Sequence, residues 1–333
     1  MRNLFYIAFA ALLTSCFEPD EVLPKQKVNE ITIRLNTSTN QATYVNLSNL
    51  LNNNIGVQTQ WQLKFQHAEN AWAIYINPLA KAGIHNTTNT DFKAINSSYE
   101  TSKITWQVDI PTASGTYPAI GAWGDYSFSN PESYKDVFIM TWEETGTYYF
   151  YKFQLLDATD SAYHIRYGAL NDSVGQTKWI VKNQNYAHSY FSLKDDALFT
   201  RLEPNKEDWN ICFTYISDST KLHPNLPHIP TANAFFGLFQ TLNINQDLNK
   251  IYLDTSTRFN EIDYFYARDL PYTRTDQLLS PFFRWNFVAQ QAFTENEIVL
   301  IVKNKEKYFA LQPTSVTSQG LESLEFKLRV KQL

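Results

Sequence analysis

The sequence predicts an all-β protein with minor helix, and three observations support this fold class. Aromatic residues make up 15% of the chain, with 20 tyrosines and 23 phenylalanines, and such side chains favour strands because they pack well on a pleated surface. Short runs that alternate apolar and polar residues recur along the chain, separated by Asn, Ser, Thr and Pro clusters typical of turns. Helical periodicity is weak throughout.

The alternating runs indicate where the clearest strands lie, namely residues 30–35, 105–110 and 297–302. Two further stretches predict hairpins. In each, a strand (VFIMTW or EIVLIVK) is followed by a tight polar turn (EETGT or NKEK) and an aromatic strand. The best candidate for a helix is one short segment, residues 231–242.

The first 15 residues have the order of a secretory signal peptide: Arg2, an apolar run from Leu4 to Leu13, and then small polar residues before Cys16. The apolar run is about half of the ~20 residues that a helix needs to cross a bilayer. Residues 13–16, Leu-Thr-Ser-Cys, resemble the bacterial lipobox, in which the cysteine is acylated and becomes the new N-terminus. We therefore expect residues 1–15 to be removed and Cys16 to carry acyl chains, palmitate included, that anchor the protein. The alternative is an ordinary signal peptide with an incidental cysteine.

Residues 16–27 read as a lipidated tether because acidic residues and a proline follow the cysteine (Phe-Glu-Pro-Asp-Glu). In one large group of anaerobic Gram-negative bacteria, acidic residues at this place resemble a signal for export to the cell surface. The sequence thus predicts an outer-membrane lipoprotein of a Gram-negative bacterium that faces outward. The alternative location is the periplasmic face.

Composition excludes several classes of protein. The net charge of −5 and the lack of a basic patch disfavour a nucleic-acid partner. Beyond the lipobox, Cys212 is the one remaining thiol, so neither an internal disulfide nor a cysteine-based zinc site is expected. It lies in the strand-like WNICFTYI, where a buried, inert thiol is expected. Phosphate-binding glycine loops, HExxH and GxSxG are absent, so we do not expect an enzyme; a hydrolase remains the weaker alternative.

An internal repeat divides the rest of the chain. A Tyr-x-x-Leu motif begins at Tyr44 and at Tyr190, and a Trp-x-x-x-Phe motif follows at Trp61 and Trp209. The Tyr-to-Trp spacing is 17 residues in the first copy and 19 in the second. Since the hairpins recur in the same order, we predict two tandem, related β-rich units, residues 28–183 and 184–333. The Trp-x-x-x-Phe motif itself is expected to be structural.

These motifs, together with the closing hairpins, resemble the HmuY-like family of haem-binding lipoproteins, and the second copy matches better than the first. The resemblance implies an all-β fold in which sheets from the two halves face each other. It also implies a surface lipoprotein that captures haem for iron acquisition, without turnover, and passes it to a TonB-dependent transporter of the outer membrane. Family members hold the haem iron through histidine or methionine, but no fixed motif marks these ligands.

A haem site in this chain would have to use histidine, because Met140 is the single methionine after the initiator. His223 and His228 are the first candidates because they lie in a stiff, proline-punctuated loop. Both would approach the iron from the same side, so a partner from elsewhere, His85 or His188, is expected. We predict no metal other than the haem iron. The alternative is that each histidine is a solvated loop residue; His164 is expected to be structural, and His67 is ambiguous.

Two other functions remain open. In the first, the protein is a surface lipoprotein that binds a glycan or a peptide through exposed aromatic side chains. The candidates are Trp123, Tyr126, Tyr148 and Tyr149, although core packing is a common role for such residues. In the second, it is an interaction protein of a surface assembly and binds no haem.

Overall fold

The computed structural model confirms the all-β class. It describes residues 26–36, 42–55, 60–67, 71–112, 115–127, 130–199, 201–217, 238–245, 248–275, 277–279, 282–286, 291–319 and 323–333. Strands account for 50% of the structure and helices for 6%, and no helix in these ranges reaches seven residues. Nor is any helix within them long and apolar enough to span a membrane.

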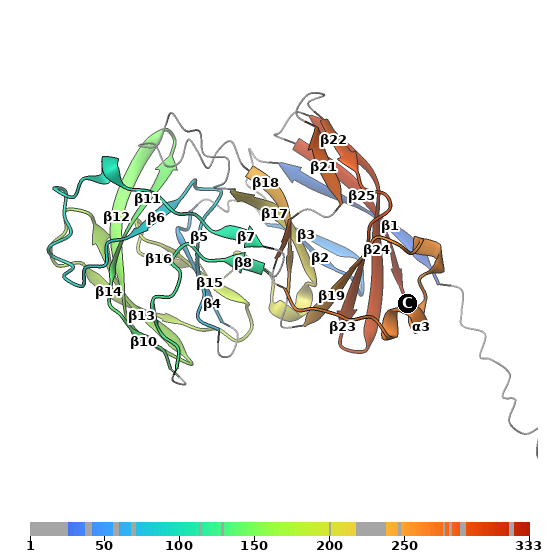
Figure 1. Cartoon of the computed structure of the whole chain (residues 1–333), viewed down its shortest axis with the longest axis horizontal. Coiled ribbons are helices and arrows are strands. Elements are labelled where there is room, and N and C mark those ends of the chain that lie inside the picture. Colours follow the sequence, from blue (N-terminus) through green and yellow to red (C-terminus); the bar gives the residue numbers. More distant parts are fainter. Residues whose placement is uncertain are drawn as a thin grey trace, which may run out of the picture.

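The first unit, at the left of Figure 1, is a pair of antiparallel sheets that enclose one core. Its apolar centre contains Phe65, Phe153 and Phe191, all fully buried between the sheets. The larger sheet has the order β14 (Gln176–Val181), β13 (Ala162–Ala169), β12 (Thr147–Thr159), β11 (Val137–Glu144), β6 (Gly83–Asn86). The smaller sheet has the order β16 (Ala197–Phe199), β15 (His188–Ser192), β4 (Leu63–Gln66), β5 (Ile74–Ile76).

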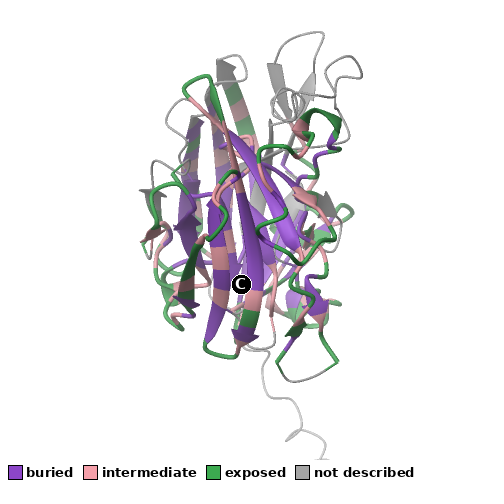
Figure 2. Ribbon diagram, turned by 90° about the vertical axis from the view of Figure 1, so that its left-hand side faces the viewer, coloured by how far each residue is buried: buried purple, intermediate pink, exposed green. Residues whose placement is uncertain are grey.

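The second unit, at the right of Figure 1, repeats this arrangement around a core that contains Ile33, Phe213 and Phe309. Across the molecule, buried residues run along the strands, and exposed residues gather in the connections (Figure 2). One sheet has the order β1 (Val28–Asn36), β25 (Ser323–Gln332), β24 (Lys307–Gln319), β23 (Val299–Asn304), β19 (Asn249–Asp254). The other has the order β20 (Gln277–Leu279), β18 (Leu238–Ile244), β17 (Ile211–Ser217), β2 (Ala42–Asn46), β3 (Leu51–Ile55).

The sheets of each unit combine strands from both sequence copies. β1, β2 and β3 precede β4 in the chain, yet they complete the sheets of β17 to β25; β14, β15 and β16 complete the sheets of β4 to β13. The sheets therefore do not divide the chain at residue 183, because β2 pairs with β17 and β15 pairs with β4. The arrangement has an approximate two-fold symmetry in which each sequence copy reaches into both units.

Long connections cover the outer faces of two sheets, that of β11 to β14 and that of β23 to β25, and form small cores of their own around Phe92 and Phe259. The connection between β6 and β11 contains η1 (Thr101–Lys103), β7 (Ile110–Thr112), β8 (Gly115–Tyr117), β9 (Gly124–Asp125) and β10 (Glu132–Ser133). The connection between β19 and β23 contains η4 (Phe259–Glu261), α3 (Tyr264–Arg268), β20, β21 (Phe283–Asn286) and β22 (Gln291–Thr294). The β7–β8 hairpin contacts β20 of the other unit, and so joins the two (Figure 1).

Both predicted hairpins are confirmed, with two-residue turns between Glu144 and Thr147 and between Asn304 and Lys307. Two other predictions are wrong. Residues 105–109 form no strand and make a single bridge, from Gln107 to Ile84 of β6; Ile110 is the first residue of β7. Within residues 231–242, the described part from Leu238 on is strand β18, paired with β17 along its whole length; residues 231–237 lie outside the described ranges.

Candidate functional site

The repeated tyrosines and tryptophans meet where the two units face each other. Tyr44 of β2 packs edge-to-face on Trp209, and Tyr190 of β15 packs in the same way on Trp61, with ring centroids 5.1 Å apart in both pairs. All four side chains are buried. Each tyrosine motif thus packs on the tryptophan motif of the other sequence copy, so these residues build the junction between the copies, as the structural interpretation of the tryptophan motif expects.

Hydrogen bonds follow the same two-fold pattern. The backbone N–H of Leu193 donates to Oε1 of Gln62 at 2.9 Å, and that of Leu47 donates to Oδ1 of Asn210 at 2.7 Å. In both copies the amide is the residue after the tryptophan, and the donor is the leucine of the Tyr-x-x-Leu motif. These two hydrogen bonds join the tyrosine motif of one copy to the tryptophan motif of the other and stabilise the junction.

A buried carboxylate breaks the symmetry on one side of this junction. Glu203 is only 3% exposed, and it accepts three hydrogen bonds. Oε2 accepts from His188 Nδ1 and from the Tyr190 hydroxyl, each at 3.0 Å, and Oε1 accepts from the backbone N–H of His188 at 2.7 Å. Burial by itself raises the pKa of Glu203, but the charge of His188 and the bonds from His188 and Tyr190 outweigh it and hold the pKa below its usual value.

The neighbouring groups are kept neutral. Burial, together with the charge of Glu203, raises the pKa of Tyr44 and of Tyr190 well above the usual value for a phenol. Burial likewise raises the pKa of Cys212, which is free and faces the same junction, so its thiol is inert as expected. The junction therefore holds one ionised carboxylate among neutral hydroxyl and thiol groups.

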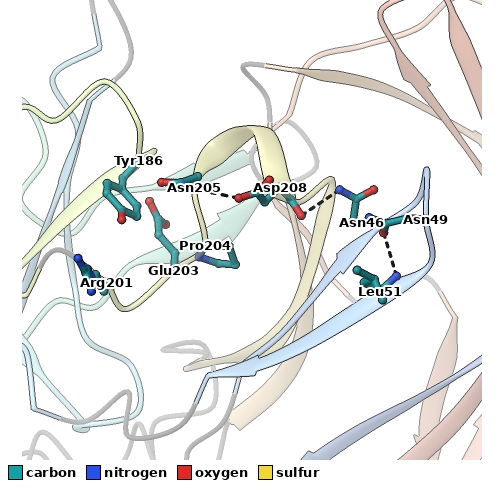
Figure 3. A pocket seen from close by; sticks show the side chains of 9 residues that line it. All are labelled: Asn46, Asn49, Leu51, Tyr186, Arg201, Glu203, Pro204, Asn205 and Asp208. Atoms are coloured by element: carbon teal, nitrogen blue, oxygen red, sulfur yellow. Dashed lines mark hydrogen bonds between the residues drawn. The ribbon is translucent and has the colours of Figure 1, made fainter.

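The carboxylate lies at the wall of a polar cavity of about 340 Å³ (Figure 3). One wall comes from β2, β3 and the turn between them. The other comes from Tyr186 and from residues 201–208, which follow β16. Asn46 Nδ2 donates to the backbone O of Asp208 at 3.1 Å and connects the two sides. The cavity is lined by Asn46, Asn49, Leu51, Tyr186, Arg201, Glu203, Pro204, Asn205 and Asp208.

The carboxylate of Glu203 orients the ring of His188. In the neutral form of His188, the proton on Nδ1 is donated to Glu203 and Nε2 keeps its lone pair. Histidines that ligate metals commonly donate their other ring N–H to a carboxylate or a carbonyl in this way, which fixes the tautomer and makes the imidazole more basic. The ring is also flanked by aromatic rings, with its centroid 6.3 Å from that of Tyr75 and 6.1 Å from that of Tyr190.

His85 does not share this site. It lies in strand β6, next to Ile84, which belongs to the core of the first unit. Its Nε2 is 3.1 Å from the Tyr99 hydroxyl, in the small core that covers the larger sheet. Burial lowers the pKa of His85 below its usual value. No contact joins His85 to His188 within the described structure.

The two remaining described histidines have structural surroundings. Both ring nitrogens of His67 are bonded: Nδ1 lies 2.9 Å from the Asn183 carbonyl, and Nε2 lies 2.8 Å from the Ser189 hydroxyl. His164, in β13, stacks on Trp179 with ring centroids 4.3 Å apart.

Three predicted site residues, Cys16, His223 and His228, lie outside the described residues. Within the described ranges, no three side chains of His, Cys, Asp or Glu gather in a way that could hold a metal ion. The described structure thus supplies His188 as the one predicted ligand with a supporting carboxylate.

The aromatic residues expected to bind a glycan or a peptide have different surroundings. Trp123 is 2% exposed and donates its indole N–H to the backbone O of Trp72, so it belongs to the core. Tyr149 stacks on Trp142. Tyr126 and Tyr148 are exposed, but Trp123 is buried, so the four side chains do not form one exposed platform.

Glu203 is the residue that sequence reasoning missed. It precedes a proline in a polar segment, where a carboxylate is usually solvated, and nothing local marks it as buried. The one indirect signal is Tyr190, whose repeated motif predicts burial and whose hydroxyl therefore needs a partner.

No protein-family model, curated protein or solved structure matches this chain. The resemblance to HmuY-like proteins stays a prediction from the motifs.

Proposed function

We propose that the protein captures haem without turnover, that His188 is one axial ligand, and that His223 or His228 is the other. The observation that supports this proposal is the hydrogen bond from His188 Nδ1 to the buried carboxylate of Glu203. It leaves Nε2 available and favours the charge of a bound metal. Bound haem would supply the iron; the chain would supply the ligands and their orientation.

The assignment of His223 or His228 rests on the sequence alone, because both residues lie outside the described ranges. The proposal needs no ligand from His85, which is held by Tyr99 on the outside of the other sheet.

Haemin titration followed by absorption spectroscopy tests the proposal. We expect a saturable, red-shifted Soret band that is lost or displaced in His188→Ala and in one of His223→Ala and His228→Ala. His164→Ala is the matched control, because it removes a histidine that stacks on Trp179 away from the junction. Glu203→Gln should keep the band but weaken the affinity by about 10-fold or more, the usual effect of removing such a partner. An unchanged Soret band in His188→Ala would overturn the assignment of this ligand.

A polar ligand such as a neutral glycan or a peptide is the second candidate, and the cavity of Figure 3 favours it. Amide groups of Asn46, Asn49 and Asn205 line this cavity together with carboxylates, which suits ligands rich in hydroxyl or amide groups. Binding to a glycan array that disappears in Asn49→Leu, in a protein with a featureless haemin titration, would favour this function over haem capture.

We further propose that the protein is exported and anchored in the outer membrane through acyl chains on Cys16, facing outward, where a TonB-dependent transporter would be the partner. Metabolic labelling with palmitate should mark the wild-type protein and leave Cys16→Ser unlabelled. Protease accessibility on intact cells distinguishes the outward from the periplasmic face. Labelling of the Cys16→Ser variant would contradict lipidation at this residue.

A further inference from the structure

The two units place the same three side chains at equivalent points of their five-stranded sheets. In the first unit, Gln154 of β12 lies opposite Arg166 of β13, whose guanidinium carbon stands 4.3 Å over the ring of Phe92. In the second unit, Gln312 of β24 lies opposite Arg329 of β25, 4.7 Å over the ring of Phe259. The surroundings of Arg166 and Arg329 can therefore be compared directly.

In the first unit, a turn covers the arginine. It joins β13 to β14, and its Val174 carbonyl accepts a hydrogen bond from Arg166 Nε at 2.7 Å. The turn also packs on the phenylalanine, since a Cβ added to Gly175 would come within 2.7 Å of Phe92 Cε1. The Asp172 carboxylate adds a negative charge, and hydrogen bonds from the backbone N–H groups of Gly175 and Val174, followed by the charges of Lys152 and Arg166, lower its pKa. The guanidinium thus has an acceptor and a countercharge from its own chain.

In the second unit, the same place is a cavity. β1 pairs with β25 as β14 pairs with β13, but β1 and β25 are not consecutive in the chain, so no turn between them covers Arg329. Its Nη2 donates to Oε1 of Gln312. The buried Nε of Arg329 has no hydrogen-bond partner among the described residues. A cavity of about 540 Å³ opens beside it. A buried donor without an acceptor costs roughly 1–3 kcal/mol. An oxyanion in the cavity would gain this contact when the Arg329 side chain shifts to expose Nε.

The lining suits a ligand that is anionic at one end and rich in hydroxyl groups elsewhere. Arg258, Arg329 and Glu297 are the charged residues of the wall. Arg258 also pairs with Glu261, Nη1 to Oε1 at 3.8 Å. Hydroxyl and amide side chains make up most of the remaining wall, and the cavity lies within the ~300–1,000 Å³ range of small-molecule sites. The full lining is Thr255, Ser256, Thr257, Arg258, Phe259, Asn260, Asn296, Glu297, Gln312 and Arg329.

We propose that this cavity is a binding site for a carboxylated monosaccharide, with the ligand carboxylate on Arg329 Nε and Arg258 and its hydroxyl groups on the serine, threonine and asparagine side chains. The ligand carboxylate takes the place that the Val174 carbonyl and the Asp172 carboxylate hold in the first unit. The site is independent of His188 and of haem.

Calorimetric titration of the purified protein with D-glucuronate, D-glucose and acetate tests the proposal. We expect saturable binding of glucuronate, at least 10-fold weaker binding of glucose and acetate, and loss of glucuronate binding in Arg329→Gln. Arg166→Gln is the matched control, because it removes the equivalent arginine that the turn covers, and it should leave glucuronate affinity unchanged. Arg258→Gln should weaken binding several-fold; its side chain is 87% exposed, so the variant folds even if Arg329→Gln does not.

Three results would overturn the proposal. Absence of saturable glucuronate binding removes the site, and equal affinity for glucose or acetate removes the ligand class. Unchanged glucuronate affinity in Arg258→Gln removes the assigned cavity.

Discussion

Acidification should destabilise this protein through His67, beginning at a pH well above that at which carboxylates titrate. His67 is 2% exposed and lies just after β4. Its Nδ1 donates to the carbonyls of Asn183 and Tyr186 at 2.9 and 3.1 Å, so Nε2 is the acceptor for the Ser189 hydroxyl. The neutral ring is fully satisfied. A second proton would place a buried charge on Nε2 and replace that acceptor by a donor.

The magnitude follows from the pKa. Burial, followed by the charge of His188, lowers the pKa of His67 to about 4, whereas the unfolded chain keeps a value of about 6.5. Between these values the unfolded state binds more protons than the folded state, so stability is lost as the pH falls from 6.5 towards 4. The loss contributed by His67 is on the order of 3 kcal/mol at pH 4.

Urea unfolding at pH 7, 6, 5 and 4 measures this loss in the wild type and in His67→Gln, whose amide can donate to the carbonyls and accept from Ser189 without gaining a charge. We expect the difference between the two proteins to shift by about 3 kcal/mol in favour of the variant between pH 7 and pH 4. His164→Gln, which removes a histidine stacked on Trp179, should follow the wild type. Equal pH dependence of the wild type and His67→Gln would refute the reasoning.

Three further predictions test other parts of the structure. Trp61→Ala and Trp209→Ala should each destabilise the protein by about 3–5 kcal/mol in chemical denaturation, because the two rings make equivalent buried contacts at the junction; a cost below about 1 kcal/mol for either would contradict this equivalence. Gly175→Ala should lower the melting temperature more than Gly146→Ala, since both positions have a positive φ, but only Gly175 faces Phe92, whereas Gly146 has open space; equal effects would argue against the close contact. In a Cys16→Ser background, Cys212 should react with a thiol reagent only after unfolding, and rapid labelling of the native protein would show that the junction opens.

Much of the local structure was predictable because it depends on local pattern. The alternation in residues 30–35 and the polar turns after Trp142 and Val302 predict strands and hairpins that the structure contains. Residues 105–110 show the limit of this reasoning. They alternate as a strand does, but they meet β6 through one bridge, and alternation carries no information about whether a neighbouring strand is available.

The site was predictable only in part. His188 was a candidate, but its partner Glu203 was not, because 15 residues and strand β16 separate the two in the chain. The lysines over the two equivalent phenylalanines show the same difficulty. Lys152 of β12 stands 4.3 Å over Phe92, while Lys331 of β25 stands 4.9 Å over Phe259, so neighbouring strands supply the ammonium group in the two units. An alignment of the two copies would not pair Lys152 with Lys331, because the two lysines come from strands at different positions in their sheets.

The amino-acid sequence by itself determines that this chain forms short antiparallel strands, that a tyrosine and a tryptophan motif occur twice, and that Cys212 is buried, since each follows from side-chain pattern. Tertiary structure alone decides that the copies exchange strands, that Glu203 is buried beside His188, and that Arg329 lacks the acceptor that Arg166 has. The physical reason is that strand pairing joins residues more than 100 positions apart. Periodicity specifies which face of a strand is apolar, but not which distant strand will cover it.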